Sequence, residues 1–171
     1  MNTGIFTFNG QQYVEKPQIF PIWLQNVANN QVLLNQQVAT PGTYMFRLKS
    51  LARDVIVYAG GSSLNGVGSR ASRPFLFRLG GTSDTSWYYG GAVPLNTSGV
   101  QTDRVLDTNC FGSGQFPFPL IPDILYPAGS NITFEVQDVA NNGNYDIHFA
   151  FSGAYLVPLD TATNSLIGSN S

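Results

Sequence analysis

Apolar and polar residues alternate with a period of two along several stretches of the chain, which is typical of β-strands with one buried face. The predicted inward positions are Tyr44, Phe46 and Leu48; Phe75, Phe77 and Leu79; Ile132, Phe134 and Val136; and Tyr145, Ile147, Phe149 and Phe151. The residues between them, including Arg47, Glu135 and His148, are predicted to face outward. These four stretches indicate strands whose aromatic faces share one core.

Shorter or less regular stretches add further strands to this picture. Strands are also predicted at 31–38, 55–58 and 154–159, with shorter candidates at 5–8, 13–14, 87–89 and 105–106. Glycine, proline and asparagine separate them, and Asn141-Asn142-Gly143-Asn144 predicts a tight hairpin between the last two alternating stretches. No segment of ten residues has a helical apolar stripe. The sequence therefore predicts an all-β fold, an antiparallel, jelly-roll-like β-sandwich of about eight or more short strands.

A chain of 171 residues with 43% apolar content suits one domain with one core. Residues 1–30 are rich in Gln and Asn and are predicted to form an N-terminal arm or a first strand, residues 31–158 the sandwich, and residues 159–171 a polar tail. Within the first segment, Phe20, Ile22 and Trp23 are too apolar for a disordered tail. We expect them to anchor the segment on its own sandwich or on a partner.

Residues 111–121 differ from the alternating stretches because prolines interrupt them. Pro117 and Pro119 remove hydrogen-bond donors and hold the backbone extended around Phe116 and Phe118. The segment is predicted to be a rigid loop or an edge strand. Its aromatic side chains either close one end of the sandwich or project into a neighbouring subunit.

Charged residues make up only 11% of the chain, less than half of the roughly 25% typical of soluble domains. Amide and hydroxyl groups must then supply the polar surface, and such a surface is less costly to bury in an interface. The net charge of −2 offers no basic excess for nucleic acid. No apolar run approaches the roughly 18 residues of a membrane span. We therefore expect assembly with protein partners, without nucleic acid or membrane.

The residues that usually carry catalysis are scarce. His148 is the only histidine and is expected at the surface or in an interface, while the single cysteine, Cys110, is expected to be a buried structural thiol. The glycines form no phosphate-binding loop, and residues 138–146 lack the spacing of a calcium-binding loop. The sequence predicts no enzyme, no cofactor and no metal. Only a pair of converging carboxylates, as in a glycosidase, is left open by the spacing.

Three consecutive aromatic residues, Trp87, Tyr88 and Tyr89, precede Gly90 and Gly91. Sugars stack on such rings while neighbouring hydroxyl and amide groups complete the hydrogen bonds, so this cluster is a candidate glycan site. The alternative is that alternating strand positions place the rings in the core or in a subunit interface.

Three segments combine aromatic strand positions with turn residues: YMFRL at 44–48, LYPAGSNITF at 125–134 and FAFSGAYLV at 149–157. With them the chain resembles small structural proteins of tailed-bacteriophage virions, most of all head decoration or cement proteins with a jelly-roll body. The resemblance spans residues 30–158. It lies in the low charge, the Asn-, Gln- and Gly-rich turns and the aromatic strands, and it involves no diagnostic motif. It implies a virion protein, made in the host cytoplasm, that sits on the capsid as a homotrimer. Its partner would be the major capsid protein or another virion protein, and it would bridge capsid subunits.

The alternative function is a carbohydrate- or host-receptor-binding module of a phage tail fibre or baseplate. In that case the cluster from Trp87 to Tyr89 would contact the ligand. For the decoration protein, Phe20, Ile22 and Trp23 would contact the capsid.

Overall fold

The computed structural model describes residues 4–58, 68–71, 73–81, 87–89, 105–113, 115–140 and 143–159. Its strands are β1 (Ile5–Phe8), β2 (Gln11–Val27), β3 (Val32–Ala39), β4 (Met45–Tyr58), β5 (Gly68–Arg70), β6 (Phe75–Gly81), β7 (Trp87–Tyr89), β8 (Val105–Leu106), β9 (Phe118–Tyr126), β10 (Asn131–Asp138) and β11 (Tyr145–Pro158). One short 3₁₀ helix, η1, covers Asp107–Asn109. The described part of the chain holds no helix long and apolar enough to cross a membrane.

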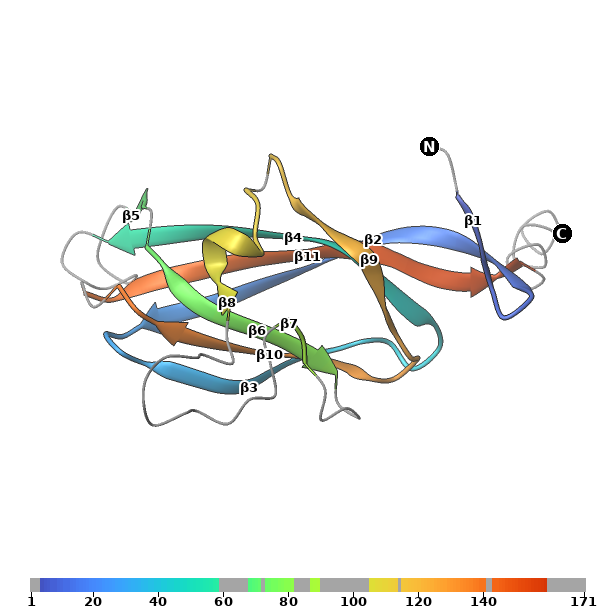
Figure 1. Cartoon of the computed structure of the whole chain (residues 1–171), viewed down its shortest axis with the longest axis horizontal. Helices are drawn as coiled ribbons and strands as arrows, with labels where there is room; N and C mark the ends of the chain where they lie inside the picture. The colour runs from blue at the N-terminus through green and yellow to red at the C-terminus, as the bar shows by residue number, and fades with distance from the viewer. Residues whose placement is uncertain are drawn as a thin grey trace, which may run out of the picture.

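Two antiparallel sheets pack face to face as a β-sandwich (Figure 1). The first sheet has the order β1-β2-β11-β4-β5, with β9 also paired to β4; the second has the order β3-β10-β6-β7, with β8 also paired to β6. When β1, β5 and β8 are set aside, the eight others form the sheets β2-β11-β4-β9 and β3-β10-β6-β7. In chain order these are 1-8-3-6 and 2-7-4-5, which is the strand order of a jelly roll.

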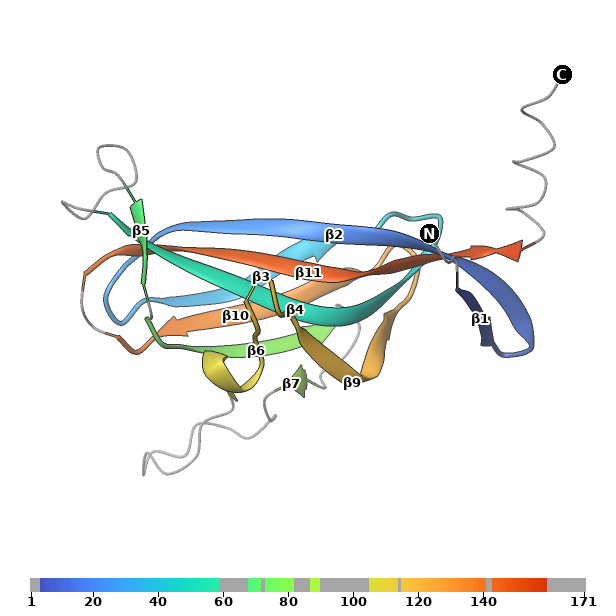
Figure 2. The ribbon, with the colours of Figure 1, turned by 90° about the horizontal axis from the view of Figure 1, so that it is seen from above.

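The two sheets differ in length. Figure 2 shows the first sheet running along the whole molecule, while the second covers only part of it. The β1–β2 hairpin and the end of β11 extend beyond the second sheet. The long axis is set by β2, β4 and β11, which have 17, 14 and 14 residues.

The core lies where the alternation of apolar and polar residues in the sequence predicts it. Every predicted inward residue of β6, β10 and β11 is buried, and so are Phe46 and Leu48 of β4. Aromatic rings from both sheets meet there: the ring centroid of Phe134 lies 5.5 Å from that of Phe151, and Phe77 lies 5.8 Å from Phe149. Such edge-on and tilted contacts add to the burial of apolar area in stabilising the sandwich.

The predicted hairpin at 141–144 is wrong, because β10 and β11 do not pair. β10 lies between β3 and β6 in one sheet, whereas β11 lies between β2 and β4 in the other. The connection crosses from sheet to sheet, which lets the inward rings of Phe134 and Phe151 face each other across the core. Residues 141–142 themselves lie outside the described residues.

Two other sequence-based expectations need correction. The separate strands predicted at 43–48 and 55–58 are one strand, β4, and those at 145–151 and 154–159 are one strand, β11. Not all strands are short, because β4 continues through an irregularity between Leu48 and Ser50, where its pairing with β9 and β11 shifts. Thr133 and Glu135, which alternate with the core positions of β10, are also buried; Glu135 Oε2 accepts from Arg78 Nε at 2.7 Å.

Of the two alternatives for residues 1–30, arm or first strand, the structure shows strands. β1 and β2 form a hairpin, and β2 pairs with β11 from Val27–Tyr145 to Tyr13–Pro158. Most of this segment is therefore an integral part of the first sheet. Removing it would strip β11 of one partner, so we expect that the sandwich does not fold without it. Of the predicted polar tail at 159–171, residues 160–171 lie outside the described residues.

Candidate functional site

The outer face of the first sheet, which points away from the core, carries the most distinctive group of side chains. Strand pairing places Trp23 of β2, His148 of β11 and Asp54 of β4 in one row across the sheet. Pro21, Ala150 and Ala52 form the neighbouring row. Large polar and aromatic groups thus stand beside a row of small residues, and the surface is hollowed where the small residues lie.

Trp23 is fixed by two contacts. Its Nε1 donates to Asp146 Oδ2 at 2.8 Å, and its indole stacks on the His148 imidazole with ring centroids 5.3 Å apart and planes 21° from parallel. The Asp146 carboxylate is buried, and its other oxygen, Oδ1, accepts from the backbone N–H of Asn26 at 2.8 Å. Trp23 nevertheless remains 51% exposed. We call the stacked Trp23 and His148 rings the Trp23 platform.

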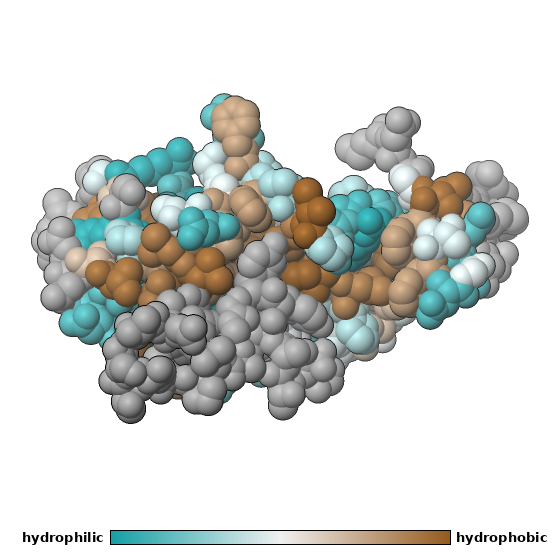
Figure 3. Space-filling model, in the orientation of Figure 1, coloured by the Kyte–Doolittle hydropathy of each residue, from teal (hydrophilic) through white to brown (hydrophobic). Residues whose placement is uncertain are grey.

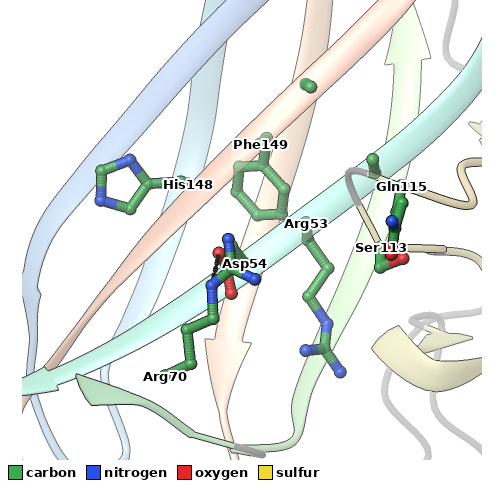
Figure 4. Close-up of a pocket in the computed structure, with 9 residues that line it drawn as sticks. Arg53, Asp54, Arg70, Ser113, Gln115, His148 and Phe149 are labelled. Atoms are coloured by element: carbon green, nitrogen blue, oxygen red, sulfur yellow. Dashed lines mark ion pairs between the residues drawn. The ribbon is translucent and has the colours of Figure 1, made fainter.

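A pocket of about 640 Å³ adjoins the platform. Figure 4 shows its walls: His148 lies on one side, Asp54 and Arg70 lie in front, and Ser113 and Gln115 lie opposite. Ala52 and Ala150 also line it. Ser113 and Gln115 come from the segment before β9, which is held beside β4 because Gly112 bonds to the backbone of Leu51 and Arg53. The pocket is therefore built by four separate segments of the chain.

The polar groups of this pocket carry balancing charges. Arg70 Nε lies 2.8 Å from Asp54 Oδ2, and the Arg70 side chain is 85% exposed. Nε2 of His148 is buried and has no hydrogen-bond partner. The site offers both donors and acceptors, without a surplus of either charge.

Arg53 also lines the pocket, but its guanidinium turns inward. It forms an ion pair with Asp107 of η1, whose side chain is fully buried. Asp107 Oδ1 also accepts from the backbone N–H of Phe75 at 3.3 Å. This pair supports the pocket from beneath.

The three predicted anchors in the N-terminal segment do not form one surface. Phe20 and Ile22 pack against the core, whereas Trp23 points to the outer face. The reason is the period of two in β2, which places Trp23 opposite to its neighbour Ile22. His148 is at the surface-facing side of β11, as predicted.

The predicted aromatic cluster forms β7 (Trp87–Tyr89), which pairs with the edge of β6. The side chains of Trp87, Tyr88 and Tyr89 lie outside what the structure describes, so their use as a glycan site stays a prediction. The sequence reasoning missed Asp54, Arg70, Ser113 and Gln115. Continuing the alternation back from the buried Val55 would have turned Asp54 outward, but only the strand order brings it next to His148.

A second notable surface lies at the edge formed by β9. Phe116 is 76% exposed and Ile121 is 86% exposed, although both are large and apolar. Figure 3 shows hydrophobic surface on the face of the molecule where β6 and β9 lie. Of the alternatives for residues 111–121, the structure shows an edge strand from Phe118 onward, with Phe111 in the core and Phe116 outside it.

The ionisable groups offer little chemistry. Among the described residues no group of three or more His, Cys, Asp or Glu side chains is placed to hold a metal ion. Cys110 is buried, and burial, with the nearby Asp107 carboxylate, raises the pKa of its thiol to about 12. A thiol with such a pKa is a poor nucleophile near neutral pH.

Searches for relatives returned none: no protein-family model, no curated protein and no solved structure matches this chain.

Proposed function

We propose that this protein is a non-enzymatic structural protein of a tailed-bacteriophage virion, a decoration or cement protein that stabilises the head by bridging subunits of the major capsid protein. The single observation that carries this proposal is the apolar pair Phe116 and Ile121, left exposed at one edge of a jelly roll. Jelly rolls serve both as capsid domains and as lectins, so the fold alone does not choose a function. Phe116 and Ile121 are the two most exposed large apolar side chains among the described residues, and burying them against a partner would remove this apolar area from water.

The β9 edge is suited to contacts through side chains. β9 contains Pro119 and Pro122, which have no N–H to offer to an added strand. A partner is therefore expected to dock on Phe116 and Ile121 themselves, without extending the sheet. The low charge of the chain reduces the cost of burying the surrounding surface.

In this proposal the protein acts as a homotrimer on the outer surface of the shell. Each contact is weak, but many copies repeated by the symmetry of the head stabilise the assembled state through avidity and linked binding. No chemical step is needed, and no cofactor takes part.

Co-sedimentation with empty heads of the encoding phage tests the proposal. We expect the wild-type protein to sediment with the heads and Ile121→Asp to remain in the supernatant. Leu34→Asp is the matched control, because Leu34 is also an exposed apolar residue but lies on β3, in the other sheet. Failure of the folded wild-type protein to bind heads, and its absence from purified virions by mass spectrometry, would refute the proposed function.

A further inference from the structure

We propose that the Trp23 platform and the adjoining pocket form a binding site for a neutral oligosaccharide. This inference stands apart from the proposed structural role, since it concerns the outer face of the first sheet and not the β9 edge. It gives the alternative function, carbohydrate recognition, a different location from the predicted cluster at Trp87 to Tyr89.

The platform has the form that sugar stacking requires. One side of the Trp23 indole packs on His148, and its Nε1 is engaged with Asp146, so the exposed half of the residue faces solvent. A sugar ring can lay its C–H face on this surface and remove apolar area from water. Because both contacts of Trp23 are already made, little side-chain entropy is lost when a ligand stacks on it.

Covering the Asp146 carboxylate is also a structural role for Trp23. That role uses Nε1 and one side of the ring, and it accounts for neither the exposed half of the indole nor the pocket beside it. The small side chains of Ala52 and Ala150 line the pocket and leave room for a ligand beside the platform.

The pocket supplies the polar contacts that a sugar needs. Asp54 offers acceptors, Arg70 offers donors, and Ser113 and Gln115 can do both. Because the charges of Asp54 and Arg70 offset each other, the site favours a neutral, hydroxyl-rich ligand over a phosphate or a metal cation.

The dimensions favour more than one sugar ring. Trp23 and Asp54 are separated by the single strand β11, so their backbones lie about 10 Å apart at the usual strand spacing. Because His148 stands between Trp23 and Asp54 in this row, a ligand that contacts both the indole and the pocket must reach across β11, a span longer than one sugar ring. The geometry points to an oligosaccharide of two or more rings.

The test is binding of a panel of neutral oligosaccharides built from glucose, galactose, mannose and their N-acetyl amines. Trp23 and Trp87 are the only tryptophans. In a Trp87→Phe background, indole fluorescence therefore reports on Trp23 alone, and saturation-transfer NMR identifies the sugar protons in contact. We expect at least one oligosaccharide to bind with a shift of this fluorescence.

Three variants locate the site. Trp23→Ala should weaken binding by at least about tenfold. Arg70→Ala should weaken binding by about threefold or more. The Arg70 side chain is highly exposed, so it can be removed without disturbing the core. This variant therefore tests the site even if Trp23→Ala does not fold. Ile19→Ala, on the same strand and the same face two rows away, should bind as the wild type does.

Several results would overturn the proposal. One is that the folded protein binds none of the neutral oligosaccharides, or binds inorganic phosphate alone. Another is that binding survives Arg70→Ala and Trp23→Ala unchanged, or that Ile19→Ala abolishes it equally. Each of these outcomes leaves the head-binding experiment unaffected, so the two proposals succeed or fail separately.

Discussion

Trp23 and Asp146 are joined by a hydrogen bond of 2.8 Å from the indole Nε1 to the buried carboxylate Oδ2. The bond links adjacent strands of the first sheet and holds the platform in place. We predict that Trp23→Phe, which keeps an aromatic ring but removes the donor, lowers the free energy of unfolding by about 2 kcal/mol, because a buried charged acceptor loses its partner. Urea denaturation measures this loss.

A double-mutant cycle separates the contribution of the Asp146 charge from the change in ring size. In an Asp146→Asn background the acceptor is neutral, so Trp23→Phe should cost about 1 kcal/mol less than in the wild type. Equal costs in both backgrounds would show that the charge of Asp146 does not strengthen this hydrogen bond.

Asp107 depends on Arg53 in a similar way, but inside the sandwich. The ion pair joins β4 to η1, and the Asp107 side chain is completely buried. We predict that Arg53→Met lowers the free energy of unfolding by about 3–5 kcal/mol, because it leaves a buried carboxylate without a counter-charge. Arg70→Met removes an exposed ion pair instead and should change stability by no more than about 1 kcal/mol.

Adding Asp107→Asn to Arg53→Met should recover part of the loss. The neutral amide needs no cation, and its oxygen can still accept from the backbone N–H of Phe75. Thermal unfolding of the single and double variants checks this order. If the double variant is the less stable of the two, the unpaired charge is not the cause of the loss.

Much of the sandwich could be predicted because burial imposes a period of two on each strand. The rings of Phe75, Phe77 and Phe149 are in the core as the alternation indicates. Alternation does not show which strands pair, and for that reason the connection after β10 looked like a hairpin. The assignment of strands to sheets depends on rings that face each other across the core, such as Phe134 and Phe151. The residues of a local turn carry no information about such contacts.

The candidate site was predictable only in part, for the same reason. Trp23 and His148 could each be identified as exposed residues of a strand. Their stacking, and the approach of Asp54, depend on β11 lying between β2 and β4. Ser113 and Gln115 lie outside the strands, in an irregular segment where apolar and polar residues do not alternate. A site assembled from cross-strand neighbours needs the strand order before its members can be recognised.

Gly153 marks a place where β4 and β11 approach too closely for a side chain. The pairing of these strands shifts between Ser152 and Gly153, and a Cβ atom on Gly153 would lie 2.0 Å from the carbonyl oxygen of Arg47. We predict that Gly153→Ala lowers the free energy of unfolding by about 3 kcal/mol, because the backbone of the sheet must move. Gly42→Ala is the matched control: its Cβ would meet nothing within 4 Å, and the change should stay within about 0.5 kcal/mol.

Urea denaturation of the two glycine variants measures the difference. A Gly153→Ala protein as stable as Gly42→Ala would mean that the two strands can separate locally at little cost. The close approach would then not be a constraint on the sequence.

Glu15, on β2 of the first sheet, makes the free energy of unfolding depend on pH. Burial alone would raise the pKa of its carboxyl, but the hydrogen bonds and charges of Lys49 and Arg47 outweigh burial and lower the pKa below the usual value of 4.5. Glu15 Oε1 lies 2.7 Å from Arg47 Nη1, and Oε2 lies 2.5 Å from Lys49 Nζ. The folded protein therefore favours the ionised carboxylate more strongly than the unfolded chain does.

The sign of the pH effect follows from that lowered pKa. The stabilisation is complete above the unfolded pKa and is lost as the pH falls through the lower pKa of the folded state. We predict that Glu15→Gln is less stable than the wild type by about 1 kcal/mol at pH 7 and that the difference shrinks below pH 4.5. Asp54→Asn, which breaks a more exposed pair, should show a smaller difference at pH 7. Urea denaturation between pH 7 and pH 3 gives both curves, and a Glu15→Gln difference that does not change with pH would contradict the role of its charge.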